Sequence, residues 1–67
     1  MAHIEKVLDK LPVAIKTQIQ TDKTVYNHEF TNKTLINNRL KGYLLALEQL
    51  KLITQAESRL IYTYITL

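Results

Sequence analysis

One long amphipathic stretch, residues 32–50, constrains the fold of this chain more than any other feature. Its apolar residues recur every three or four positions, so they share one side of a helix with about 3.6 residues per turn. These residues are Ile36, Leu40, Tyr43, Leu44, Leu47 and Leu50. The spacing predicts a central helix that begins at the capping residue Thr31 or Asn32 and supplies the surface on which the other segments pack.

The segment after the central helix predicts a second helix that returns alongside it. Thr54 and Glu57 form the capping-box pattern, in which each side chain binds the backbone N–H of the other residue. A turn at residues 51–53 precedes this start, so the two helices form a hairpin. The apolar side of the last helix comprises Ala56, Leu60, Ile61, Tyr64, Ile65 and Leu67, and Tyr62 faces away from it. Residues 60–66 also contain strand-forming residue types, which leaves a short strand as the alternative there.

Proline divides an amphipathic stripe near the start of the chain. Apolar residues at helical spacing run from residue 2 to residue 20, and they are Ile4, Val7, Leu8, Leu11, Ile15 and Ile19. Pro12 has no N–H to donate, so an uninterrupted helix through it costs about 3 kcal/mol. We therefore predict two helices, at residues 2–11 and 12–20, the second capped by Asp9 with Pro12 in its first turn. A single helix kinked at Pro12 is the alternative.

Residues 21–31 are polar and lack a sustained helical period, so we expect them to connect the second helix to the central one. Tyr26 and Phe30 lie four positions apart within this segment. We expect them to fold over the junction between the N-terminal stripe and the central helix, because buried aromatic side chains stabilise a core. The alternative is that they anchor a partner.

Composition favours a single all-α domain, residues 1–67, built as a small bundle of three to four helices. One Gly and one Pro in 67 residues are too few for the many turns of an all-β fold. The absence of Cys suits a reducing cytoplasm. No apolar run reaches the roughly 18 residues of a membrane span, and the first residues lack a signal-peptide pattern. We therefore predict a cytoplasmic protein that does not enter the membrane.

The inventory of reactive residues argues against catalysis. Ser58 is the only serine, His3 and His28 stand in separate segments, and a single Gly cannot build a phosphate-binding loop. A domain of this size also rarely encloses a pocket of a few hundred cubic ångströms. We therefore expect no enzyme activity, metal ion, cofactor or small-molecule substrate.

A second face of the central helix carries small side chains. Gly42 and Ala46 lie beside Leu35 and Arg39, and their size would let another helix approach closely. The neighbour is either the N-terminal helix or a second copy of the chain, so a homodimer is one option. Leu45 points the opposite way and is either an ordinary exposed leucine or a contact residue.

The net charge of +3 arises in residues 31–67, because residues 1–30 hold equal numbers of lysines and acids. Candidate contacts to nucleic acid at the start of the central helix are Lys33, Asn37, Asn38, Arg39 and Lys41. The run from Leu40 to Ile53 resembles the recognition helix and exit of winged helix-turn-helix proteins. That resemblance implies a dimeric DNA-binding regulator in which Lys33, Asn37, Asn38 and Lys41 face the DNA groove. The alternative is that these polar residues only solvate an outer face.

A second resemblance extends from Arg39 to Tyr64. This part of the chain resembles small helical accessory proteins of phages and mobile elements of Gram-positive bacteria. The residues that carry the resemblance are Arg-Leu-Lys-Gly-Tyr-Leu-Leu-Ala-Leu, then Leu-Ile-Thr, then Glu57 and the tyrosines. The resemblance implies an adaptor or inhibitor that binds a host or element-encoded enzyme. From the exposed apolar and rim residues, we predict contacts to a protein partner at Tyr26, Phe30, Leu45 and Tyr62, with Arg39 and Lys41 at the edge. A homo-oligomeric scaffold is a third reading.

Overall fold

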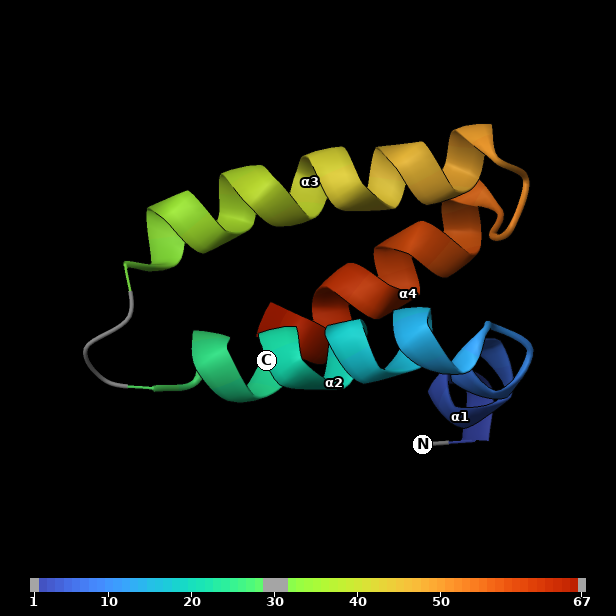
Figure 1. Cartoon of the computed structure of the whole chain (residues 1–67), viewed down its shortest axis with the longest axis horizontal. Helices are drawn as coiled ribbons and strands as arrows, with labels where there is room; N and C mark the ends of the chain where they lie inside the picture. The colour runs from blue at the N-terminus through green and yellow to red at the C-terminus, as the bar shows by residue number, and fades with distance from the viewer. Residues whose placement is uncertain (1, 29–31, 67) are drawn as a thin grey trace.

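The computed structural model describes residues 2–28 and 32–66, which form four α-helices. They are α1 (Ala2–Asp9), α2 (Val13–Tyr26), α3 (Lys33–Gln49) and α4 (Gln55–Thr66). Helix α4 returns antiparallel to α3 and packs against each of the other helices, and α1 lies at the end of the bundle where α2 begins (Figure 1). The predicted all-α fold with a final helical hairpin is confirmed. Residues 60–66 are helical, so the strand alternative is wrong.

The core lies around α4, because that helix contacts every other helix. Ile19 of α2 and Ile61 and Ile65 of α4 have no exposed surface, and Leu40 of α3 is 1% exposed. Each such side chain contributes about 1.5–3 kcal/mol on burial. The remaining members of the buried cluster are Ile4, Val7, Leu8, Leu11, Leu44, Leu47 and Ile53. Most of the N-terminal stripe and most of the central stripe are therefore buried as predicted, and Ile15 is half-buried against the cluster.

Pro12 breaks the N-terminal stripe into two helices and does not kink a single one. It occupies the N-cap of α2 with extended angles (φ −54°, ψ 147°), and its carbonyl oxygen accepts from the N–H groups of Ile15 and Lys16 at 3.0 Å. Asp9 was predicted to cap this helix, which is wrong, because Asp9 ends α1. Its carboxylate instead lies 2.9 Å from Lys16 Nζ.

Helix α2 continues to Tyr26, so the predicted connection over residues 21–31 is wrong for residues 21–26. The physical reason is that the helical period continues through a polar residue. Ile15, Ile19, Asp22 and Tyr26 are spaced by four, three and four positions, and Asp22 is as buried as a core residue. Tyr26 packs against the core, in agreement with the expectation that it folds inward. Phe30 lies outside the described residues.

Helix α3 is capped at both ends by specific hydrogen bonds. The Asn32 side chain accepts from the Leu35 N–H at 3.2 Å. At the other end the N–H groups of Leu52 and Lys51 donate to the carbonyls of Leu47 and Glu48, at 3.0 and 2.9 Å. This pair of bonds is a Schellman motif, and Lys51 adopts the left-handed conformation it requires, with φ 60°.

The turn also explains why one residue of the central stripe is exposed. Leu50 was predicted to be buried, but it is 68% exposed because it caps the helix where the chain changes direction. Ile53, three residues later, is 4% exposed and fills the core position instead. Ala56, also predicted on the apolar side, is exposed in the first turn of α4, and Leu67 lies outside the described residues.

The predicted capping box starts α4. The Glu57 N–H donates to Thr54 Oγ1 at 3.1 Å, and the Thr54 N–H donates to Glu57 Oε1 at 2.8 Å. Lys10, in the turn between α1 and α2, lies 2.5 Å from Glu57 Oε2. The hydrogen bond from Lys10, followed by that from the Thr54 backbone, holds the pKa of Glu57 below its ordinary value. One carboxylate therefore joins the two turns at this end of the bundle.

The small face of α3 has no neighbour in the described part of the chain. A Cβ at Gly42 would meet nothing within 4 Å, and Ala46 is exposed as well. The prediction that the N-terminal helix approaches Gly42 closely is therefore wrong. The physical reason is that α4 covers the opposite face of α3, through Leu40, Leu44 and Leu47. A second copy at this face stays a prediction.

Candidate functional site: a groove between α3 and α4

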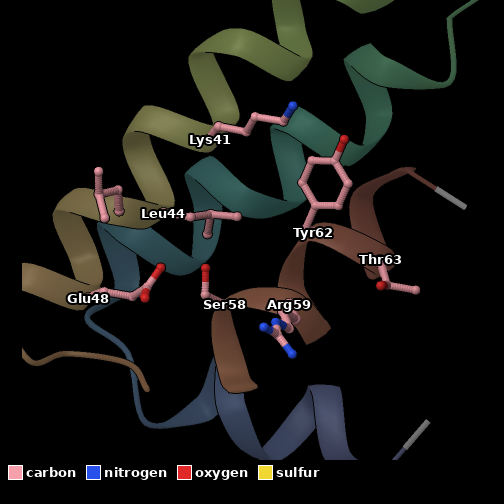
Figure 2. Close-up of a pocket in the computed structure, with 8 residues that line it drawn as sticks. Lys41, Leu44, Glu48, Ser58, Arg59, Tyr62 and Thr63 are labelled. Atoms are coloured by element: carbon pink, nitrogen blue, oxygen red, sulfur yellow. The ribbon is translucent and has the colours of Figure 1, made fainter. Parts of the chain in front are cut away.

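An open groove of about 580 Å³ runs between α3 and α4. Lys41, Leu44, Leu45 and Glu48 line it from α3, and Ser58, Arg59, Tyr62 and Thr63 line it from α4. The α3 residues are spaced by three, one and three positions, which places them on one face of that helix. Figure 2 shows side chains of both helices pointing toward the space between them. Two antiparallel helices thus present a two-sided surface.

The inner surface of the groove is apolar. Leu44 is 3% exposed and closes the bottom of the groove, while Leu45 remains 53% exposed on the α3 side. Tyr62 was predicted to face away from the apolar side of the last helix, yet it is half-buried and packs against the core. Its hydroxyl donates to Asn37 Oδ1 of α3 at 3.1 Å, and this bond fixes the ring as one wall of the groove. The groove therefore has an aromatic wall that is hydrogen-bonded to α3, and an exposed leucine.

Charged side chains at the groove have no charged partner in the described part of the chain. Lys41 and Arg59 are both exposed and form no ion pair there, and Glu48, half-buried, forms none either. The groove thus presents two positive charges and one negative charge. An exposed charge without an ion pair can bind another molecule without first breaking a contact within the protein.

The first half of α3 is different, because its cations contact other helices. Lys33 Nζ donates to the carbonyl oxygen of Tyr26 at 2.7 Å and lies 4.3 Å from the centroid of the Tyr26 ring. The ammonium group thereby places a positive charge at the carboxyl end of α2, where the helix dipole favours it. Lys23 makes the same pair of contacts at the end of α4, with the carbonyl at 2.7 Å and the ring of Tyr64 at 4.5 Å.

Arg39 is held by a buried carboxylate that the sequence analysis did not single out. Its Nη2 atom lies 3.2 Å from Asp22 Oδ1, which also accepts from Gln18 Nε2 at 3.0 Å. The Asp22 side chain is 6% exposed and that of Arg39 is 61% exposed. Burial, and then the charge of Asp22, raise the pKa of the neighbouring Tyr43. The sequence could have indicated that Asp22 is buried, because Asp22 lies at helical spacing from Ile19 and Tyr26 on the apolar side of α2.

The structure brings together some predicted contact residues and separates others. Among the predicted protein contacts, Lys41, Leu45 and Tyr62 line the groove, whereas Arg39 and Tyr26 lie on the α2 side. Among the predicted nucleic-acid contacts, Lys33, Asn37 and Arg39 bind other helices. Asn38 and Lys41 are exposed. The nucleic-acid candidates thus do not form one outward surface.

Five lining residues were not predicted as contacts: Leu44, which was predicted only as a core residue, and Glu48, Ser58, Arg59 and Thr63. On α3, Glu48 lies seven positions after Lys41 and three after Leu45, so helical spacing from Lys41 would have found it. No comparable signal marks the α4 residues, because their relation to α3 depends on the angle at which the hairpin closes.

Two further findings bear on the kind of site. Among residues 2–28 and 32–66, no three His, Cys, Asp or Glu side chains gather where they could hold a metal ion. None of the helices in these ranges has both the length and the apolar character needed to cross a membrane. No protein-family model matches the chain, and no curated protein or solved structure is significantly similar to it.

Proposed function

We propose that this protein is a small binding module that acts on a protein partner through the α3/α4 groove, without chemistry of its own. The resemblance to accessory proteins of phages and mobile elements supports an adaptor or inhibitor that occupies the surface of an enzyme. The observation that carries the proposal is the groove itself, where an exposed Leu45, the hydrogen-bonded ring of Tyr62 and charges without an ion pair in residues 2–28 and 32–66 lie together.

These residue types suit protein recognition for physical reasons. Binding energy concentrates in a few apolar and aromatic side chains that become fully desolvated, surrounded by a polar rim. Leu45 and Tyr62 are such side chains, and Lys41, Glu48 and Arg59 surround them. The unpaired cations accelerate association with an acidic surface, while the apolar residues set the rate of dissociation.

Contacts within the bundle favour a protein partner over DNA. A DNA-binding helix uses its cations on phosphates, yet Lys33 and Arg39 already bind Tyr26 and Asp22. Each would have to leave its present contact to reach a phosphate. A dimeric helix-turn-helix regulator is therefore an outcome that the test must detect and is not our proposal.

The test is capture of the partner by tagged protein from a lysate of the source cells, with and without nuclease. Leu45→Asp places a charge in the groove, and Leu35→Asp is the matched control because Leu35 is 65% exposed and lies outside the groove. We expect the wild type and Leu35→Asp to retain one protein after nuclease treatment. Leu45→Asp should lose it by about 30-fold in affinity, as expected for a contact of about 2 kcal/mol.

Three results would overturn the proposal. Equal capture by Leu45→Asp would remove the groove as the contact surface. Recovery of nucleic acid alone, lost on nuclease treatment, would establish the DNA-binding alternative, and its salt dependence would then count the phosphate contacts. Capture of untagged copies of the same chain alone would establish a homo-oligomer instead.

A further inference from the structure

We infer that the α3/α4 groove receives an amphipathic helix with acidic residues beside its apolar stripe, an inference that rests on the proposed function. The residues that line the groove set its shape and its charge, and a bound molecule must complement both. Two independent features define that occupant: the helical walls, and the two cations that form no ion pair within the described part of the chain.

The walls of the groove favour a helix over an extended strand. A strand binds by pairing its backbone with an exposed sheet edge, and residues 2–28 and 32–66 contain no sheet. Two neighbouring helices instead present side-chain ridges, and the ridge of a third helix fits between them. The lining residues Lys41 to Glu48 span seven positions, or about 10 Å, which matches about two turns of a docked helix.

The charges of the groove favour an acidic helix. Lys41 on α3 and Arg59 on α4 stand on opposite walls, and neither forms an ion pair in the described residues, so with Glu48 in the same groove the net charge of the lining is positive. A helix lying between them brings residues on both sides of its apolar stripe to these two cations. Carboxylates at those positions would be complementary, and ammonium groups there would be repelled.

The positions of the charges along the groove add a direction to this preference. Glu48 and Arg59 lie at the end of the groove near the turn that joins α3 to α4, and Lys41 lies toward the other end (Figure 2). The amino terminus of a helix is partially positive and its carboxyl terminus partially negative. Glu48 and Arg59 offset each other at one end, so the uncompensated charge is that of Lys41, and a helix whose last turn lies near Lys41 has the favoured orientation, which is parallel to α4.

The test uses a display library of helical peptides as the probe. Each peptide carries leucines at helical spacing and random residues on both sides of that stripe, so the library itself does not impose a charge. We expect wild-type protein to select peptides enriched in Asp and Glu beside the stripe. Binding of a selected peptide should fall about tenfold in Arg59→Glu or Lys41→Glu.

Lys51→Glu is the matched control, because it changes the charge of an exposed lysine by the same amount outside the groove. It should leave the affinity of the selected peptide nearly unchanged. Amide shifts in the NMR spectrum of the bound protein should map to the groove residues of α3 and α4.

Selection of neutral or basic peptides would overturn the inference, and so would shifts outside the groove or failure to select any peptide. These failures are distinguishable from failure of the proposed function. If Leu45→Asp abolishes capture of the cellular partner while acidic peptides are not selected, the groove binds a protein whose contact is not an acidic helix. If capture is insensitive to Leu45→Asp, the proposed function fails as well.

Discussion

The two halves of α3 use the same kinds of polar residue in different ways. In the first half, Lys33 and Arg39 contact α2, and Asn37 contacts α4. In the second half, Lys41 and Glu48 line an open groove without a charged partner in the described residues. The exposed fraction alone does not reveal this difference, because Arg39 and Lys41 are both exposed. Partners distinguish a cation that holds the fold from one that is available for binding.

Arg39→Ala and Lys41→Ala test this difference and should give the largest contrast. Removing Arg39 leaves the buried carboxylate of Asp22 without its cation, which we expect to cost about 2 kcal/mol. Lys41→Ala should change the free energy of unfolding by less than about 0.5 kcal/mol, because Lys41 is exposed and forms no ion pair in the described residues. Thermal or denaturant unfolding measures both values, and a domain of this size loses about 4–8 °C in Tm per kcal/mol.

The cause of the Arg39 effect is checked by a second substitution. Asp22→Asn removes the buried charge, so the double variant Arg39→Ala/Asp22→Asn should recover part of the stability lost in Arg39→Ala. No recovery would mean that Arg39 contributes through the packing of its aliphatic stem and not through the ion pair.

A smaller effect should come from the capping box at the start of α4. Thr54→Ala removes the acceptor for the Glu57 N–H and should lower the free energy of unfolding by about 1 kcal/mol. Thr54→Ser keeps the hydroxyl and serves as the control. If Thr54→Ala is neutral in urea unfolding, the start of α4 is held by tertiary contacts alone.

The turn residue Lys51 should give an effect of opposite sign. Its φ of 60° is unfavourable for a side chain with a Cβ, so Lys51→Gly should stabilise the protein by about 0.5–1 kcal/mol. Lys51→Ala retains the Cβ and is the matched control, without this gain. The denaturant midpoints of the two variants and the wild type measure this gain. A Lys51→Gly variant less stable than the wild type would contradict the left-handed conformation at this position.

The pH dependence of stability should show the smallest effect, through Glu57. Because its pKa in the folded state is lowered from the ordinary value of 4.5, its charged form stabilises the fold. That contribution is present above pH 4.5 and is lost as the pH falls through the lower folded pKa. Glu57→Gln should therefore lose less stability on acidification than the wild type, as melting curves at several pH values would show. Equal losses would assign the acid sensitivity to other carboxylates.

The sequence correctly predicted those features of the fold that depend only on residues close together in the chain. The capping box of Thr54 and Glu57, the break at Pro12 and the stripe of Leu40, Leu44 and Leu47 all act within a few positions of the chain. Their outcome is fixed by backbone hydrogen bonding and helical spacing. For this reason the all-α fold and most of the core were predictable from the sequence.

Errors arose where one residue had two physical roles. Asp22 interrupts the apolar stripe of α2 but is buried because Arg39 and Gln18 bind it, and its polarity made the end of α2 resemble a loop. Leu50 continues an apolar stripe but caps a helix. Tyr62 lies off the main apolar face, yet its hydroxyl reaches Asn37. Partners distant in sequence decide all three cases, and a single sequence does not reveal them.

The same limit applies to the groove. Lys41, Leu45 and Tyr62 were predicted as contact residues one by one, and the sequence did not show that they share a surface with Glu48 and Arg59. The crossing of α3 over α4 creates that surface. The site is therefore a property of the hairpin and not of either helix.

The position of α4 at the centre of the bundle also has a consequence for biosynthesis. Helix α4 is the fourth in chain order, yet α1, α2 and α3 all pack against it. Until the ribosome has made α4, the apolar stripes of the earlier helices lack the helix that covers most of them. Folding is thus a late event, because contacts between α1 and α4 join distant parts of the chain. A nascent chain stalled before α4 would expose the residues that later form the core.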